Sequence, residues 1–148
     1  MTCILDASAV LALFHGERGA EKVESALEGA LISTVNWAEV VQKSVSRGIA
    51  VEGMRDELLG TGVSIEVFTA QQAEMAGRLW VDTQQLGLAL GDRACLSLAL
   101  GATQAVRMHQ GHKSTHLLQC RFRLSLVYEF VYQADLSGNV RKSGLQAF

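Results

Sequence analysis

Apolar positions along residues 1–101 follow two different spacings. Short β-prone or apolar runs at "TCIL" (2–5), "LIST" (31–34) and "VSIEVF" (63–68) predict strands. The longer segments between and after them place apolar residues at helical spacing, so we expect helices over 9–14, 19–30, 36–47, 51–60, 69–85 and 91–101. Thr69 and Gln72 have the spacing of a capping box. This order predicts an α/β fold, a three-layer α/β/α sandwich with a central parallel sheet.

Three acidic residues lie where these predicted elements meet. Asp6 ends the first strand, Glu39 falls in the first turn of the helix over 36–47, and Asp92 begins the helix over 91–101. Ligand sites of parallel sheets form beyond the carboxyl ends of the strands, and Mg²⁺ and Mn²⁺ prefer carboxylate oxygens. The three acids are therefore candidate metal ligands.

Each acid also has a purely structural interpretation. Asp6 could begin a turn, and Asp92 could be an N-cap or a first-turn acid. Asn36 and Glu39 have the N-x-x-E spacing of a capping box, in which Glu39 would accept a hydrogen bond from the Asn36 backbone N–H. Spacing alone leaves these alternatives open.

Composition favours one globular domain over residues 1–148. Apolar residues make up 49% and charged residues 19% of the 148 positions, which is enough apolar material for a self-sufficient core. Three scattered cysteines do not suggest a disulfide framework, and we find neither a signal peptide nor an apolar run long enough to cross a membrane. We therefore expect a cytoplasmic protein.

The charge changes sign along the chain. Residues 1–105 carry seven basic and 13 acidic side chains, whereas residues 106–148 carry six basic and two acidic ones. The later segment also lacks a clear period, apart from a strand-like run at "LSLVYEFVYQ" (124–133) and an expected frayed terminus over 136–148. Residues 106–148 are thus atypical of the rest of the chain.

The segments around the three acids resemble a known family. The blocks "ILDASAVLALF", "ISTVNWAEVV" and "LGLALGDRACLSLAL" are similar, in order and spacing, to the three motif blocks of PIN-domain ribonucleases, in particular the VapC-like toxins of type II toxin–antitoxin pairs. The resemblance covers residues 1–101. It implies a PIN-like α/β/α fold, and it implies that Asp6, Glu39 and Asp92 bind Mg²⁺ or Mn²⁺ and activate water to cleave RNA.

The same resemblance implies supporting residues and partners. Ser8 and Asn36 match positions that support the family's acidic site through hydrogen bonds. The expected partners are an RNA substrate, a cognate antitoxin protein that inhibits the nuclease, and a second copy of the chain in a homodimer.

The chain departs from the family after Asp92. The family's pattern has a fourth acid at the end of the next strand, but here the next acidic residue after Asp92 is Glu129. Three interpretations follow: a three-acid site that binds metal more weakly, a degenerate PIN-fold module that mainly binds a protein partner, or a shift of the coding frame near residue 105.

Overall fold

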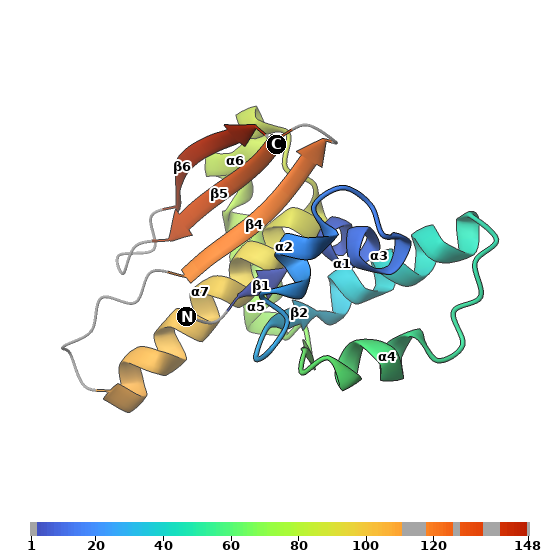
Figure 1. Cartoon of the computed structure of the whole chain (residues 1–148). Helices are drawn as coiled ribbons and strands as arrows, with labels where there is room; N and C mark the ends of the chain where they lie inside the picture. Colours follow the sequence, from blue (N-terminus) through green and yellow to red (C-terminus); the bar gives the residue numbers. More distant parts are fainter. Residues whose placement is uncertain (1–2, 111–117, 126–127, 135–139, 148) are drawn as a thin grey trace.

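The computed structural model describes the backbone of residues 3–110, 118–125, 128–134 and 140–147, and the side chains of residues 3–102. Strands and helices alternate along the first two thirds of the chain (Figure 1). The elements are β1 (Ile4–Leu5), α1 (Ala7–His15), α2 (Ala20–Glu24), β2 (Leu31–Ser33), α3 (Thr34–Ser46), α4 (Met54–Gly60), β3 (Ser64–Glu66), α5 (Ala70–Arg78), α6 (Trp80–Thr83), the 3₁₀ turn η1 (Gln84–Leu86), α7 (Leu90–Gln110), β4 (Leu118–Ser125), β5 (Tyr128–Ala134) and β6 (Val140–Ala147).

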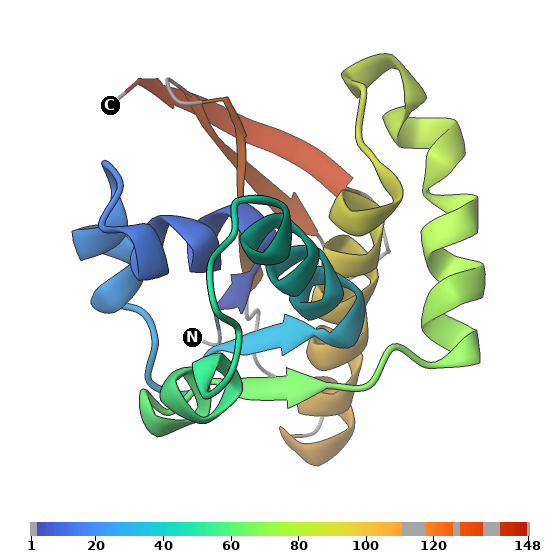
Figure 2. The same cartoon turned by 90° about the vertical axis from the view of Figure 1, so that its right-hand side faces the viewer.

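These strands form one sheet in the order β3-β2-β1-β4-β5-β6. β1, β2, β3 and β4 run parallel, with Ile4 opposite Leu31 and Leu31 opposite Ser64. Figure 2 shows β2 and β3 side by side and pointing the same way. The predicted parallel sheet is confirmed for these strands, and β5 and β6 extend it in the antiparallel sense.

Helices cover the two faces of the sheet. Neighbouring residues of a strand point to opposite faces, and because both are apolar here, both faces need a covering layer. Ile4 and Leu31 face a core formed with α5 and α7, which includes Leu96 of α7 and also Leu79 and Leu88 from the connecting segments. Figure 2 shows α5 and α7 together on that side of the sheet. The predicted α/β/α sandwich is therefore confirmed.

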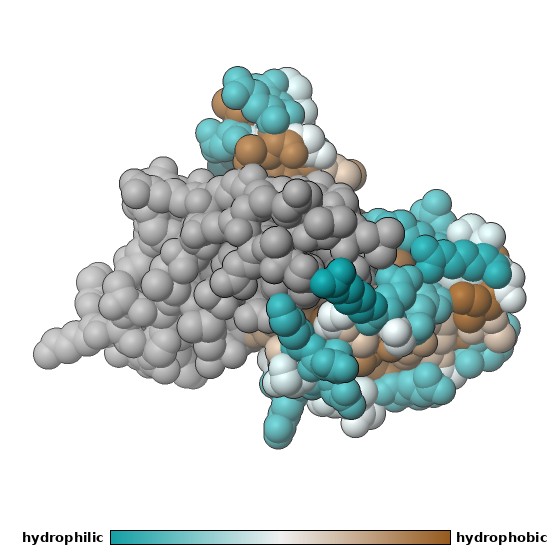
Figure 3. All heavy atoms as spheres, turned by 45° about the horizontal axis from the view of Figure 1, so that its top comes forward, coloured by the Kyte–Doolittle hydropathy of each residue, from teal (hydrophilic) through white to brown (hydrophobic). Residues whose placement is uncertain are grey.

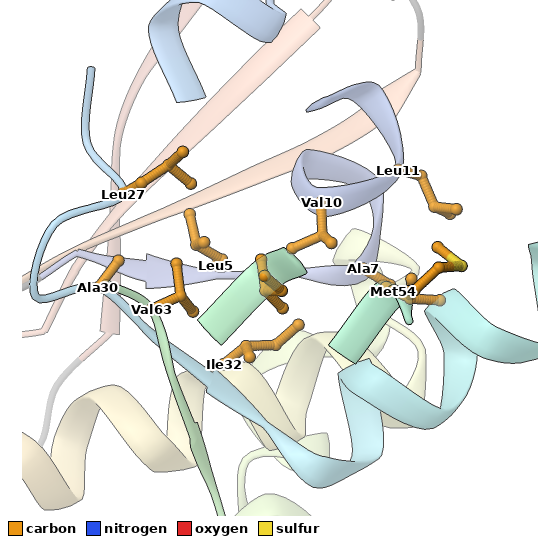
Figure 4. Packing of buried hydrophobic residues seen from close by; sticks show 11 residues of the cluster. Leu5, Ala7, Val10, Leu11, Leu27, Ala30, Ile32, Met54 and Val63 are labelled. Carbon is orange, nitrogen blue, oxygen red and sulfur yellow. The ribbon is translucent and has the colours of Figure 1, made fainter. Parts of the chain in front are cut away.

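The opposite face holds a second core between the sheet and α1, α3 and α4. Leu5 and Ile32, the neighbours of Ile4 and Leu31 in their strands, turn toward Val10, Val40 and Leu58. Figure 4 shows Leu5, Val10, Ile32 and Val63 converging in this layer. Burying a side chain of the size of leucine contributes about 1.5–3 kcal/mol, so this cluster anchors the strand ends that carry the acids.

Several helix limits differ from those expected, although the start of α5 does not. Thr69 and Gln72 form the predicted capping box at the start of α5. The continuous helix predicted over 69–85 instead divides into α5, α6 and η1, and the one predicted over 19–30 is limited to α2. The helix predicted over 91–101 extends from Leu90 to Gln110. The apolar spacing in the sequence does not show where a helix is interrupted, because it reflects which side chains are buried and not which backbone groups are hydrogen-bonded.

The C-terminal region contains more strand than the sequence predicts. The expected strand over 124–133 is divided between β4 and β5, and the expected frayed terminus contains β6. β4 pairs in parallel with β1, so Ile4 lies opposite Cys120. The expected position of the family's fourth acid falls within residues 106–116, of which 106–110 belong to the end of α7 and 111–116 lie outside the described residues.

Apolar side chains remain on two parts of the described surface. One group belongs to α6, η1 and the start of α7: Trp80, Val81, Leu86 and Leu90 are 51%, 66%, 40% and 57% exposed. Figure 3 shows apolar atoms over α6 at the top of the view and a second apolar area on the side where α1, α3 and α4 lie. Within the described part of the chain, no helix combines the length and apolar character needed to cross a membrane.

Candidate acidic site

Asp6 lies at the carboxyl end of β1 and caps α1. Its carboxylate accepts hydrogen bonds from the Ala9 backbone N–H at 2.8 Å and from the Ser8 hydroxyl at 2.6 Å. The side chain is buried. An aspartate is a favoured N-cap because it satisfies a backbone donor that the helix leaves unpaired. The predicted contact between Ser8 and the acidic residue is present, and it orients one of the two Asp6 oxygens.

Glu39 belongs to α3, which begins two residues earlier than predicted. Ser33 is the N-cap, and its hydroxyl accepts a hydrogen bond from the Val35 backbone N–H at 3.3 Å. The capping-box alternative for Asn36 and Glu39 is therefore wrong, and so is the placement of Glu39 in the first helical turn, since Glu39 lies in the second. Ser33 takes the capping role because it is the last residue of β2 and its backbone is still extended.

Asn36 instead connects α3 to the start of α7. Its side-chain amide donates to the Gly91 carbonyl at 3.1 Å, across 55 positions in the sequence. The residue is 1% exposed, and its Oδ1 atom has no hydrogen-bond partner. A buried unpaired oxygen costs free energy, so such an atom in a native structure points to a role beyond packing.

Asp92 lies in the first turn of α7, where its Oδ2 accepts a hydrogen bond from the Ala89 backbone N–H at 2.7 Å. The pKa of this carboxyl is raised above its ordinary value by burial and, to a smaller extent, by the nearby charge of Glu39. The Ala89 hydrogen bond and the charges of Lys43 and Arg93 lower it, without cancelling the increase. The structure therefore brings Glu39 and Asp92 into one electrostatic environment.

Gly91 allows α3 and α7 to approach closely at this point. A Cβ atom at position 91 would lie 2.9 Å from Glu39 Oε2 and 3.7 Å from Asn36 Nδ2. Contacts this short between a Cβ and a carboxylate oxygen require the neighbour to move. The glycine thus leaves room for the end of the Glu39 side chain, and its backbone conformation, which has no positive φ, would accept another residue.

Two basic residues lie beside the acids. Lys43 Nζ is 2.6 Å from Glu39 Oε1, one helical turn further along α3. Arg93 donates from Nε to the Ala76 carbonyl at 3.1 Å and from Nη1 to the Leu88 carbonyl at 2.8 Å. Arg93 therefore fastens α7 to α5, whereas Lys43 neutralises part of the acidic charge.

The three predicted metal ligands share one edge of the sheet without forming a closed cluster. Asp6 follows β1, and Glu39 lies in the helix that follows the neighbouring parallel strand β2. Among the described side chains, no three His, Cys, Asp or Glu residues form a group that could hold a metal ion. Glu39 lies against Gly91, the residue before Asp92, and the three-acid metal site remains a prediction.

The donors at this edge nevertheless fit a hard divalent cation. Carboxylate and amide oxygens are its preferred ligands, and Asn36 leaves a buried oxygen unpaired. Metal-binding chemistry is therefore consistent with the residues present.

Two residues of this edge were not predicted from the sequence as part of a site. Lys43 follows Glu39 by four positions, the spacing of a helical ion pair, so its contact could have been found. For Gly91 the sequence shows only a glycine at the start of a predicted helix. Its role could not be predicted because its neighbours in space, Asn36 and Glu39, come from a distant part of the chain.

The protein has a parallel sheet with helices on its two faces, and acidic residues lie beyond the ends of its strands. These features define the class of α/β proteins with an acidic site at the edge of the sheet. Residues 3–106 match the PIN domain family, so the chain belongs to that family and the predicted membership is confirmed. The match ends beside the charge break at residue 105, and the idea of a frame shift there stays a prediction.

A solved structure, a toxin–antitoxin complex from Klebsiella pneumoniae, contains a chain with a similar fold. The TM-score is 0.52 and the identity 22%, over 70% of this chain and 81% of that one. At this identity the likeness concerns the fold. No curated protein sequence matches the chain.

Proposed function

We propose that this PIN-domain protein is a metal-dependent endoribonuclease toxin that hydrolyses RNA phosphodiester bonds through Asp6, Glu39 and Asp92. The observation that carries the proposal is that the Glu39 carboxylate lies against Gly91, the residue before Asp92, at the sheet edge that also holds Asp6. Family membership supports it, since PIN domains are typically nucleases. Like charges gathered at one edge cost free energy, and a cation such as Mg²⁺ or Mn²⁺ would offset that cost.

The protein's own residues would hold and orient the reacting groups. Asp6, Glu39 and Asp92 would supply carboxylate oxygens to Mg²⁺ or Mn²⁺, and Ser8 would fix the direction of the Asp6 carboxylate. The bound cation would lower the pKa of a coordinated water and neutralise charge that develops on the phosphate. Asn36 would keep α3 against α7, so that Glu39 stays beside Asp92.

Cleavage of a labelled structured RNA in Mg²⁺, in Mn²⁺ and with a chelator tests this activity. We expect cleavage with metal and none with the chelator. Asp6→Asn is the sharpest variant, because asparagine caps helices about as well as aspartate but lacks the negative charge. Metal-dependent cleavage that persists undiminished in Asp6→Asn, or its absence from the folded wild-type protein, would refute the proposal.

A cognate antitoxin is the proposed inhibitor of this nuclease. The exposed apolar residues Trp80, Val81, Leu86 and Leu90 offer a surface that a protein could cover, and Leu90 lies two positions before Asp92. The fold is also similar to that of a chain in a toxin–antitoxin complex. A homodimer is the further expected assembly, which light scattering after size-exclusion chromatography would test.

A second candidate function is that of a weakly active or inactive PIN-fold module that mainly binds a protein partner. Two observations favour it: Glu39 is occupied by Lys43, and no acidic residue occurs between Asp92 and Glu129. This module would bind Mn²⁺ poorly. Calorimetric titration with Mn²⁺ separates the candidates, because a clear isotherm that is lost in Glu39→Ala supports the nuclease and a flat one supports the module.

A further inference from the structure

The ion pair between Lys43 and Glu39 occupies one of the two oxygens that Glu39 could offer to a cation. Lys43 Nζ contacts Oε1 at 2.6 Å, while Oε2 lies against Gly91. The two side chains are 45% and 36% exposed, so the pair is in contact with solvent. Pairs of this kind stabilise proteins weakly and exchange readily. A cation that binds Oε1 therefore competes with the lysine, and an exposed ion pair opposes this exchange only weakly.

Lys43 also acts on the second acid of the pair. Its charge favours the ionised form of Asp92, whereas the charge of Glu39 opposes it. The lysine thus relieves the mutual repulsion of the two carboxylates, which is the electrostatic effect that a bound metal would have. Arg93 is less able to move into this role, because its guanidinium donates to the carbonyls of Ala76 and Leu88.

We propose that Lys43 is an exchangeable counter-ion of the acidic site, bound to Glu39 without a divalent cation and released to an RNA phosphate when a cation takes Glu39. This inference rests on the proposed function. A lysine suits the exchange because its ammonium group is a compact charge on a flexible stem, with three donors that phosphate oxygens accept. Metal binding would thereby be coupled to substrate binding through one side chain.

The first test measures Mn²⁺ affinity by calorimetry in the full chain. Lys43→Met removes the competing charge, so we expect Mn²⁺ to bind about 1.5- to 5-fold more tightly, the range that follows from the strength of an exposed ion pair. Lys43→Arg should bind Mn²⁺ as the wild type does. Arg78→Met is the matched control, because Arg78 forms an exposed i,i+4 pair with Glu74 on α5 at 3.8 Å. It should leave the affinity unchanged.

The second test measures binding of a single-stranded phosphorothioate RNA, which resists cleavage, by fluorescence anisotropy as salt is varied, with Mn²⁺ present and with the proposed metal ligands Asp6, Glu39 and Asp92 left intact. Losing one phosphate contact reduces the slope of log affinity against log salt by about 0.7. We expect this reduction for Lys43→Met and none for Arg78→Met. Thermal melting confirms that each variant is folded.

The outcomes separate this inference from the proposed function. If the wild type binds Mn²⁺ but Lys43→Met binds it equally or less tightly, the counter-ion role is wrong and the nuclease proposal stands. An unchanged salt slope in Lys43→Met overturns the transfer of the lysine to phosphate. If the folded wild type binds no Mn²⁺ at all, both proposals fail together.

Discussion

Replacing Gly91 by alanine separates the stability of the fold from the geometry of the acidic site. Glycine in a helix is about 0.5–1 kcal/mol less favourable than alanine, so the substitution by itself should stabilise α7 by up to that amount. The backbone at this position does not have a positive φ, so alanine introduces no strain of its own. Stability should therefore be retained or should increase slightly.

The new methyl group acts instead on Glu39. It would begin 2.9 Å from Oε2, whereas ordinary contacts start at 3.4 Å, so the carboxylate must move by about 0.5 Å. Metal ligands tolerate errors of only about 0.2 Å, and disturbances of the groups around a metal site typically reduce affinity by about 10-fold or more. The flexible Glu39 side chain absorbs the clash, so the cost appears in metal binding and not in folding.

Urea denaturation and calorimetric Mn²⁺ titration measure the two effects separately. Gly77→Ala is the control, because Gly77 lies inside α5 and a Cβ there meets no atom within 4 Å. It should stabilise the protein without changing metal affinity. A loss of more than about 1 kcal/mol of unfolding free energy in Gly91→Ala, or an unchanged Mn²⁺ affinity, would show that the close approach of Gly91 to Glu39 has been misjudged.

Three further predictions concern the residues that position the acids. Asp6→Ala should lower the free energy of unfolding by about 0.5–2 kcal/mol because α1 loses its cap. Asp6→Asn should keep most of the wild-type stability, because asparagine also caps helices. Equal losses for the two variants in urea titrations would exclude a capping role. Asn36→Ala should lower the free energy of unfolding by about 1–3 kcal/mol, since the Gly91 carbonyl loses its side-chain donor and a buried space is left. A free energy of unfolding close to that of the wild type would contradict this. Asp92→Asn should be more stable than the wild type at pH 7 and lose that advantage on acidification. Because the pKa of Asp92 is raised in the folded protein, ionising this carboxyl costs stability once the pH exceeds the unfolded-state pKa, near 4. The cost disappears below that pH. A stability difference between the variant and the wild type that does not depend on pH would refute the raised pKa.

The sequence determined the kind of fold and the family, and it pointed to the residues that we propose carry the chemistry. Strand-like runs that alternate with helical spacing led to the α/β/α sandwich, because that periodicity reports burial on one or two faces. The motif blocks around Asp6, Glu39 and Asp92 led to the PIN family, which the match over residues 3–106 confirms. Local signals also sufficed for the capping box of Thr69 and Gln72, since its partners are three positions apart.

Only the tertiary structure decided how these residues are arranged. Ser33, not Asn36, caps α3, and Asn36 binds the Gly91 carbonyl across 55 positions. The capping motif at Asn36 does not form for two reasons. Ser33, at the end of β2, has an extended backbone directly before the helix and caps it. In addition, the packing of α3 on α7 gives the Asn36 amide another acceptor, the Gly91 carbonyl. The contact of Gly91 with Glu39 and the raised pKa of Asp92 arise in the same way, from chain segments whose separation in sequence conceals their proximity in space.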